Sequence, residues 1–185
     1  MQPAMDRLYR IAEPQAGYVT TAQAAEVGVS RQELYYLSRT GELRHVAYGI
    51  QRLARFPSSP HEDIVVACLW AGDEAVASYE TAFVVYGIGE AMPATIHITT
   101  PNRFRGRRPG VRVHHEAIDP DERAHFEGVP VTAPVRTIAD VARQSPSDAR
   151  AALRDALDRR LIRRGQLHTA AVKYPHARAV LGVTS

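Results

Sequence analysis

Apolar residues recur with a helical period in the first part of the chain, and polar residues that favour helix starts interrupt them. Leu8, Ile11 and Ala12 stand at i, i+3 and i+4, which predicts a short amphipathic helix that closes a small core. Thr20 and Gln23 have the spacing of a capping box, in which the hydroxyl accepts from a backbone N–H and the glutamine returns to the cap. A second helix is therefore expected to begin at Thr20.

A second capping box follows after a short turn. Gly28 ends the preceding helix, and Ser30 and Glu33 begin another of about ten residues, which stops at the Thr-Gly pair 40–41. The turn at 27–29 between the two caps is typical of the corner of a helix-turn-helix. Duplex DNA is therefore the leading candidate partner.

The exposed side of the helix that begins at Ser30 has the chemistry of a base-reading surface. Leu34 and Leu37 set its buried direction at about 100° per residue. The opposite side carries Gln32, Tyr35, Tyr36 and Arg39. Glutamine can pair with adenine, arginine with guanine or phosphate, and tyrosine offers a phosphate donor or a flat apolar contact. The alternative interpretation is a solvated face whose tyrosines pack on a neighbouring domain.

A hairpin is expected directly after this helix. Residues 43–46 and 50–53 read as two strands about a tip at 47–49, whose glycine can take a positive φ. Arg44 and Arg52 would flank this wing and contact the DNA backbone or a minor groove. The DNA-binding residues expected from helix and hairpin together are Ser30, Arg31, Gln32, Tyr35, Tyr36, Arg39, Arg44, Tyr48 and Arg52. The first part of the chain is thus predicted to be a winged helix-turn-helix domain.

Two prolines and two serines interrupt the pattern at 56–60 and predict a domain boundary. We place a linker at 57–60, between a winged helix-turn-helix domain at 1–56 and a mixed α/β domain at 61–185. The second domain is expected to contain helices at about 61–71, 79–87, 134–143 and 147–161, a short C-terminal helix, and strands at about 94–100, 111–115 and 129–132. Strands adjacent in sequence suggest an antiparallel pair with helices covering one side, so the fold class is α+β.

Charge is divided unevenly along the chain, whose formal net charge is +3. Residues 56–101 carry six acidic and no basic residues, or −6, whereas 102–115 carry five arginines and no acidic residue, or +5. This alternation indicates separate acidic and basic surfaces. The densest cationic stretch is the loop 102–110, with Arg103, Arg105, Arg107 and Arg108 around Phe104. This loop could bind a nucleic-acid backbone and an exposed base, and it would suit an acidic protein partner equally well. The alternative interpretation is a solvated hairpin tip without a partner.

Signatures of common enzymes are missing from the sequence. It contains no Walker A loop, no G-x-G-x-x-G, no G-x-S-x-G and no H-E-x-x-H, so we expect neither catalysis nor a cofactor. His114 and Glu116 share one side of a strand while His115 does not, and two ligands do not complete a metal site. Arg136 and Asp140 stand at i, i+4 and are expected to form a simple intrahelical pair worth roughly 0.3–0.5 kcal/mol.

The remaining features favour a cytoplasmic protein. No apolar run approaches the ~20 residues that a membrane span needs, and the N-terminus has no signal-peptide pattern. Cys68 is the single cysteine and lies among apolar residues, so a buried and inert thiol is expected.

Several motifs together resemble the AbiEi antitoxins of bacterial type IV toxin–antitoxin systems. They are Gly17-Tyr18-Val19-Thr20-Thr21-Ala22-Gln23-Ala24, Gly28-Val29-Ser30-Arg31, Gly41-Glu42-Leu43-Arg44-His45-Val46, Gly49-Ile50-Gln51-Arg52-Leu53, Ile96-His97-Ile98-Thr99-Thr100-Pro101, Val111-Arg112-Val113-His114, and the stretch from Val131 to Asp140. The resemblance implies an operon autorepressor whose N-terminal winged helix binds operator repeats. It further implies that the C-terminal domain counteracts a nucleotidyltransferase-like toxin encoded next door. Gln51 departs from the tyrosine that relatives more often have in the wing.

Two other functions are compatible with the residues. One is a stand-alone winged-helix transcription factor whose second domain senses a ligand or mediates oligomerisation. The other is a nucleic-acid-processing enzyme with a nuclease-related second domain. The operator sequence, the oligomeric state and any direct contact with a toxin are left open by the sequence.

Overall fold

The computed structural model describes residues 2–182, and the part before the predicted linker has the elements of a winged helix-turn-helix. Its elements are α1 (Gln2–Ala12), η1 (Glu13–Gln15), β1 (Tyr18–Thr20), α2 (Thr21–Glu26), α3 (Arg31–Arg39), β2 (Leu43–Ala47) and β3 (Ile50–Leu53). The three helices and the hairpin agree with the expectations from sequence. Strand β1 was not predicted, because a strand of three residues shows too little alternation to be recognised.

The hairpin belongs to a three-stranded sheet with the order β1-β3-β2, and each face of this sheet contributes buried side chains. Val19, Leu43 and Leu53 belong to the core of the first part, together with residues of α1, α2 and α3. Tyr18 and Ile50 belong to the core of the second part. Because successive side chains of a strand point to opposite faces, one sheet borders two cores. The division into two domains at 57–60 stays a prediction.

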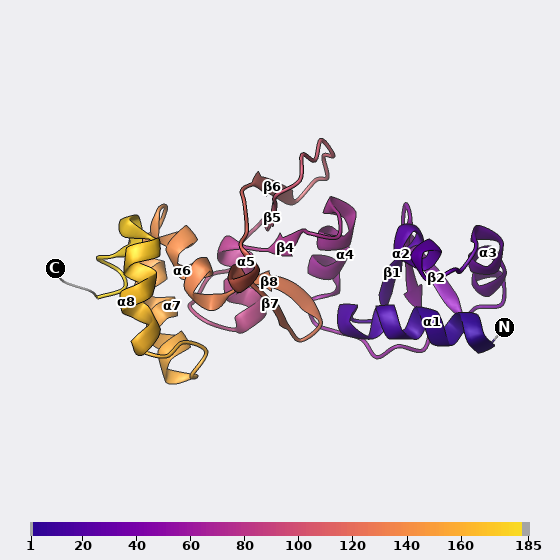
Figure 1. Cartoon of the computed structure of the whole chain (residues 1–185), viewed down its shortest axis with the longest axis horizontal. Coiled ribbons are helices and arrows are strands. Elements are labelled where there is room, and N and C mark those ends of the chain that lie inside the picture. Colours follow the sequence, from indigo (N-terminus) through magenta and orange to yellow (C-terminus); the bar gives the residue numbers. More distant parts are fainter. Residues whose placement is uncertain (1, 183–185) are drawn as a thin grey trace.

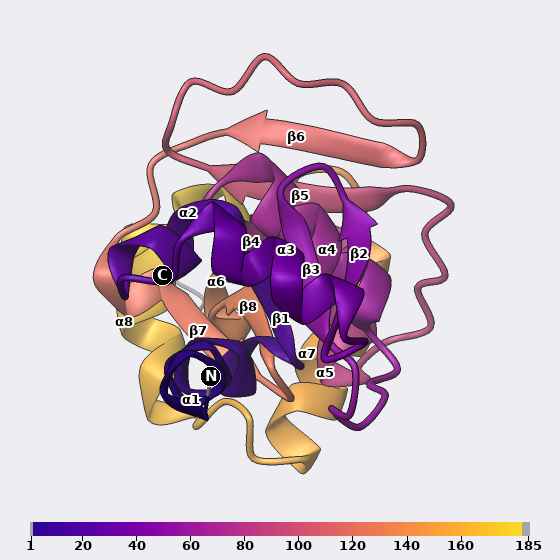
Figure 2. The ribbon, with the colours of Figure 1, turned by 90° about the vertical axis from the view of Figure 1, so that its right-hand side faces the viewer.

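The second part places a five-stranded sheet among helices. Its elements are α4 (Glu62–Ala71), β4 (Val76–Ala77), α5 (Tyr79–Tyr86), β5 (Ile96–Thr100), β6 (Val111–His115), η2 (Pro120–Glu122), β7 (Arg123–Phe126), β8 (Val129–Thr132), α6 (Pro134–Ala142), α7 (Pro146–Asp158), α8 (Gly165–Lys173) and η3 (Pro175–Ala177). Figure 1 shows an elongated molecule with α3 near one end and α8 near the other. Helices α4 and α5 lie on opposite sides of the sheet, whereas helices on one side were expected (Figures 1 and 2).

The sheet has the order β6-β5-β4-β8-β7, and the pairing of β5 with β6 corrects the expectation from sequence. These two strands are parallel, with Ile96 opposite Val111 and Thr100 opposite His115. Residues 101–110, when extended, span more than the length of the five-residue strand β5. The chain can therefore run back to the level at which β5 begins and then enter β6 in the same direction. The Arg-rich segment is thus a crossover loop (residues 101–110) outside the edge strand β6, as Figure 2 shows, and not a hairpin tip.

The second part contains a large apolar core. Cys68 is buried there as expected, and burial raises the pKa of its thiol. Phe83, Ile98 and Ile138 are among the largest fully buried side chains. Within residues 2–182, no helix is both long and apolar enough to cross a membrane.

Candidate nucleic-acid interface

Helix α3 is held in place by its cap and by an arginine from α1. The Ser30 hydroxyl accepts a hydrogen bond from the Glu33 amide at 3.2 Å, and the Ser30 amide donates to the Glu33 carboxylate at 2.8 Å. The hydrogen bonds from Ser30, the backbone one first, lower the pKa of Glu33. Arg7 donates to the carbonyl oxygens of Val27 and Gly28 at 3.0 and 3.1 Å. The turn before α3 is therefore fixed from both sides, which gives α3 a defined position.

The side of α3 that faces away from the core is exposed along its length. Leu34 and Leu37 are buried, as their spacing predicted. Tyr35 and Tyr36 are 66% and 49% exposed, so they do not pack on the second part of the chain. Within residues 2–182, no side-chain hydrogen bond or ion pair engages the polar residues of this side, which are Arg31, Gln32, Tyr35, Tyr36 and Arg39. Their polar groups are thus free to bind another molecule.

A groove of about 710 Å³ lies between α3 and the wing. Its lining includes Thr21, Ala22, Ala25, Val29, Ser30, Arg31, Leu34, Tyr35, Ser38, His45, Tyr48, Gly49 and Gln51. Tyr48 stands at the tip of the wing and is 99% exposed. His45 and Gln51 were not among the candidates from sequence. They are cross-strand partners, and only the register of β2 on β3 places both beside this groove.

The wing carries one exposed arginine where the sequence predicted two. Arg44 and Arg52 are cross-strand partners and therefore share a face of the sheet. Arg44 lies on the outer strand and is exposed. Arg52 lies on the central strand and is only 8% exposed. The prediction that Arg52 flanks the wing as a DNA contact is therefore wrong, because the second part of the chain covers this face of the central strand.

Arg52 instead joins the two parts of the molecule. Its guanidinium contacts the Glu62 carboxylate on α4 at 2.9 Å and donates to the carbonyl oxygen of Phe56 at 3.1 Å. The Tyr18 hydroxyl also donates to Glu62, at 2.8 Å. Burial, together with this hydrogen bond, raises the pKa of Tyr18 to about 12, so the phenol keeps its proton at neutral pH. The cluster bridges the predicted linker. It fixes the three-stranded sheet β1-β3-β2, which we call the wing sheet, on α4.

The crossover loop forms a cationic surface in the second part. Its four arginines, Arg103, Arg105, Arg107 and Arg108, make no side-chain hydrogen bond or ion pair within the described part of the chain, and all but the half-buried Arg108 are exposed. Phe104 packs edge-on against Trp70 of α4, with ring centroids 4.7 Å apart. The loop and strand β6 together border a concave surface of about 810 Å³.

The second part contains a buried charge cluster that no motif in the sequence indicated. Arg136 contacts Asp140, Glu122 and Glu116 at 2.7 to 2.8 Å, and its side chain is 9% exposed. The expected simple intrahelical pair is thus one arm of a cluster with three carboxylates. Glu116 and Glu122 come from segments that only the tertiary structure brings to α6, so no spacing in the sequence identifies them.

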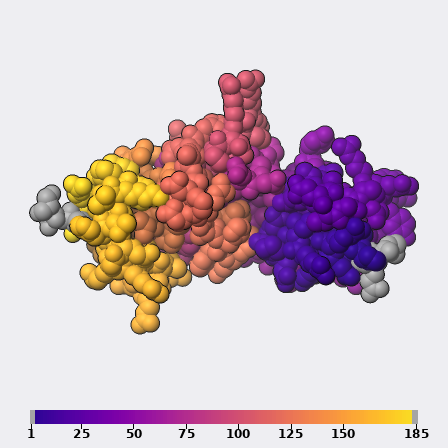
Figure 3. Space-filling view, in the orientation of Figure 1, coloured from indigo at the N-terminus to yellow at the C-terminus, as the bar shows by residue number. Residues whose placement is uncertain are grey.

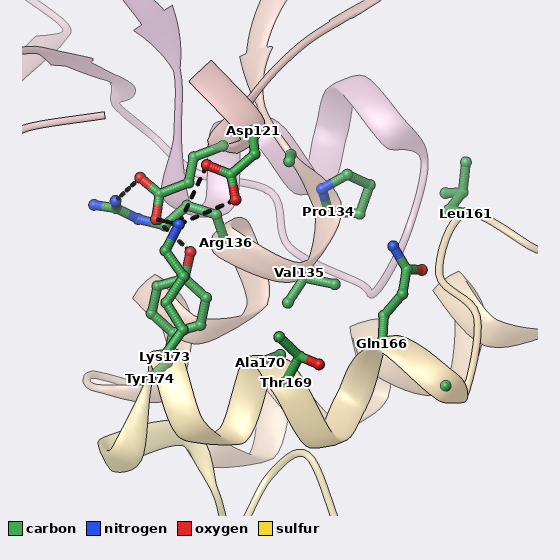
Figure 4. A pocket seen from close by; sticks show the side chains of 13 residues that line it. Asp121, Pro134, Val135, Arg136, Leu161, Gln166, Thr169, Ala170, Lys173 and Tyr174 are labelled. Atoms are coloured by element: carbon green, nitrogen blue, oxygen red, sulfur yellow. Dashed lines mark hydrogen bonds and ion pairs between the residues drawn. The ribbon is translucent and has the colours of Figure 1, made fainter. Parts of the chain in front are cut away.

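This cluster continues into the pocket of about 340 Å³ that Figure 4 shows. The ammonium of Lys173 contacts Asp119, Asp121 and Glu122 at 3.1 to 3.2 Å. Burial opposes ionisation of Glu122, but hydrogen bonds from Tyr174 and the Asp119 amide lower its pKa to about 2. Figure 4 shows the charged groups gathered at one end of the pocket. Since Arg136 and Lys173 each contact three carboxylates, and both contact Glu122 of η2, we interpret the cluster as a structural link between η2, α6 and α8.

The fold and the exposed α3 face define a winged helix-turn-helix protein with an appended α/β part. Two family models match the sequence. The model described as "Transcriptional regulator, AbiEi antitoxin" matches residues 6–50, and the model described as "AbiEi antitoxin C-terminal domain" matches residues 74–180. The chain belongs to the AbiEi antitoxin family, with an N-terminal transcriptional-regulator domain followed by the AbiEi C-terminal domain.

A solved structure has a similar fold. The crystal structure of the RV2827C protein from Mycobacterium tuberculosis superposes with a TM-score of 0.52 and 16% sequence identity, over 97% of this chain and 76% of that one. At this identity the likeness concerns the fold alone. No curated protein matches the sequence.

Proposed function

We propose that the protein is the DNA-binding antitoxin and autorepressor of a type IV toxin–antitoxin operon and that it acts in the cytoplasm without catalysis of its own. In this proposal α3 enters the major groove of operator repeats, and the second part of the chain counteracts a nucleotidyltransferase-like toxin. Membership of the AbiEi family supports the antitoxin role. The observation that carries the DNA-binding role is the exposed polar side of the capped helix α3 beside the wing.

The residues of α3 divide into two roles. Gln32 and Arg39 lie on the side opposite to the buried leucines and are proposed to read bases, because their side chains suit adenine and guanine edges. Arg31 and Tyr35 line the groove toward the wing and are proposed to contact the sugar-phosphate backbone. The Ser30 hydroxyl donates to the Glu33 carboxylate at 2.8 Å and serves the cap, so its proposed DNA contact is limited to its remaining acceptor capacity.

The wing is proposed to contact the backbone beside the base-reading helix. Tyr48 at its tip and Arg44 on its outer strand are exposed. Arg52 is excluded from this surface by its pairing with Glu62. Arg44 and Tyr48 should therefore contribute affinity without sequence preference.

The test uses duplex DNA from the region upstream of the gene that encodes this chain. We expect Gln32→Ala and Arg39→Ala each to weaken specific binding by about 1–3 kcal/mol without affecting the folded structure. Arg10→Ala is the matched control, since Arg10 is an exposed arginine of α1, which lies on the other side of the first part from the wing tip (Figure 1). Unchanged affinity and unchanged sequence preference in both α3 variants would remove α3 from the interface.

The antitoxin role needs a second measurement. Expression of the neighbouring gene alone should arrest growth, and its co-expression with the wild-type chain should restore growth. A neighbouring gene that leaves growth unaffected would favour an ordinary winged-helix regulator.

A further inference from the structure

The crossover loop concentrates positive charge that the rest of the described chain does not neutralise. By comparison, Arg52 contacts Glu62, and Arg136 contacts three carboxylates. No such contact engages the four loop arginines at positions 103, 105, 107 and 108 within residues 2–182. Four like charges held together repel one another, and a polyanion would relieve that repulsion.

The base of the loop is anchored, so its arginines are held near the body of the protein. Phe104 packs on Trp70 at 4.7 Å between ring centroids. The Asn102 side chain donates to Glu74 at 3.0 Å, and the carbonyl oxygen of Asn102 lies 3.1 Å from Nδ1 of His115. These contacts tie the start of the loop to α4, to the end of β6 and to the segment before β4. Positioning of this kind lowers the entropic cost of binding a ligand.

The loop and the wing project to the same side of the molecule. In Figure 1 the loop between β5 and β6, the wing between β2 and β3, and α3 follow one another along the upper edge. Figure 2 shows the loop and the wing tip on the same upper side after a quarter turn. The protrusion at the top of Figure 3 has the colour of the crossover loop. A rod-shaped ligand that contacts α3 and the wing can therefore continue toward the loop.

We propose that the crossover loop binds the phosphate backbone of the same DNA duplex, outside the segment read by α3. This inference rests on the proposed function of α3 and adds a second contact from the second part of the chain. Arginine guanidinium groups match phosphate oxygens in charge and geometry. A single helix-turn-helix spans only a few base pairs, and added backbone contacts from the same chain raise its affinity.

A protein partner fits the loop less well. Protein interfaces usually centre on a buried aromatic or apolar anchor. Phe104 is the only aromatic residue of the loop, and it already packs on Trp70. The surface left for a partner is cationic, which suits the backbone of DNA better than the centre of a protein interface.

The experiment measures DNA affinity as a function of salt. The variant Arg103→Ala, Arg105→Ala, Arg107→Ala and Arg108→Ala is titrated with the upstream duplex and with a duplex of unrelated sequence. Each phosphate contact that is lost should reduce the log–log salt slope by about 0.9. We expect a slope reduced by about 2–4, the same proportional loss of affinity for both duplexes, and an unchanged melting temperature.

Two matched variants separate local contacts from net charge. The control Arg150→Ala, Arg154→Ala, Arg163→Ala and Arg164→Ala removes the same number of charges from exposed positions at the other end of the molecule (Figure 1). It should keep the wild-type slope. Lysine at the four loop positions should restore most of the slope, because lysine retains the charge.

The outcomes also separate this inference from the proposed function. If the wild-type chain shows no sequence-specific binding, the function proposed for α3 fails. If the α3 variants lose binding as expected while the loop variant keeps the wild-type slope, the loop proposal alone is overturned. Loss of toxin rescue with unchanged DNA binding would likewise overturn it and assign the loop to a protein contact.

Discussion

The guanidinium of Arg52 lies 2.9 Å from the carboxylate of Glu62 and thereby joins the wing sheet to the first helix of the second part. Burial acts against ionisation of Glu62, yet hydrogen bonds from the Ser59 amide and the Tyr18 hydroxyl, together with Arg52, keep its pKa below the ordinary value. An arginine that the sequence suggests as a DNA contact thus serves to hold two parts of the chain together.

Arg52→Ala should therefore reduce stability and leave the DNA contacts intact. The change leaves Glu62 and several carbonyl oxygens without their donor, and we expect a loss of about 1–3 kcal/mol in the free energy of unfolding. Chemical denaturation and the salt slope of DNA binding check this. Arg44→Ala should give the opposite pattern, with normal stability and a slope reduced by about 0.9. A reduced slope with normal stability in Arg52→Ala would return this arginine to the DNA surface.

A chain that ends at Ser59 should fail to rescue cells from the toxin, because the proposed neutralisation belongs to the second part. It should also melt at a lower temperature than the full chain, since truncation uncovers Tyr18 and Ile50 and removes Glu62. Ile50→Thr sharpens the test. In the full chain it should cost about 1–3 kcal/mol by burying a hydroxyl in an apolar core, whereas in the short chain it should be nearly neutral. Equal costs in both chains would show that the second part does not support the wing.

Arg136→Ala should be among the most damaging substitutions in the second part. It leaves Asp140 buried without its cation and Glu122 with Lys173 alone, and breaking a buried ion pair typically costs about 3–5 kcal/mol. Arg150→Ala is the control, because Arg150 is an exposed arginine of α7 and its loss should cost less than about 0.5 kcal/mol. Urea unfolding of both variants measures the difference. Similar costs would mean that the cluster contributes no more than a surface contact.

The free energy of unfolding should depend on pH through His114. Burial and the neighbouring His97, whose Nδ1 lies 3.1 Å from Nε2 of His114, lower the pKa of His114 to about 4. The unfolded chain binds a proton near pH 6.5 and the folded chain only near pH 4. This contribution to stability is therefore present above about pH 6.5 and is lost as the pH falls to about 4.

The variant His114→Gln isolates that contribution. Its difference in free energy of unfolding from the wild type should shrink by about 1–2 kcal/mol between about pH 7 and about pH 4.5, because only the wild type loses the contribution of this histidine. The magnitude allows for solvent screening, since the ring is only half-buried. Denaturation at a series of pH values measures it. A difference that stays constant over this range would contradict the assignment to His114.

The sequence by itself determined the local features of the first part. Each capping box needs only residues three apart, so Ser30 and Glu33 revealed the start of α3. The leucines at positions 34 and 37 then fixed its buried side and, by exclusion, the exposed position of Gln32 and Arg39. Such features depend on backbone periodicity and on neighbours within one helical turn.

Only the tertiary structure decided the rest, because it concerned contacts between distant segments. The burial of Arg52 required α4 to cover the central strand of the wing sheet. The partners of Arg136 at positions 116 and 122 come from other elements, and residues 101–110 form a crossover because β5 and β6 pair in parallel. Local sequence is compatible with several strand pairings and several charge partners. The free energy of each depends on which distant surfaces pack together, so only the tertiary structure selects one.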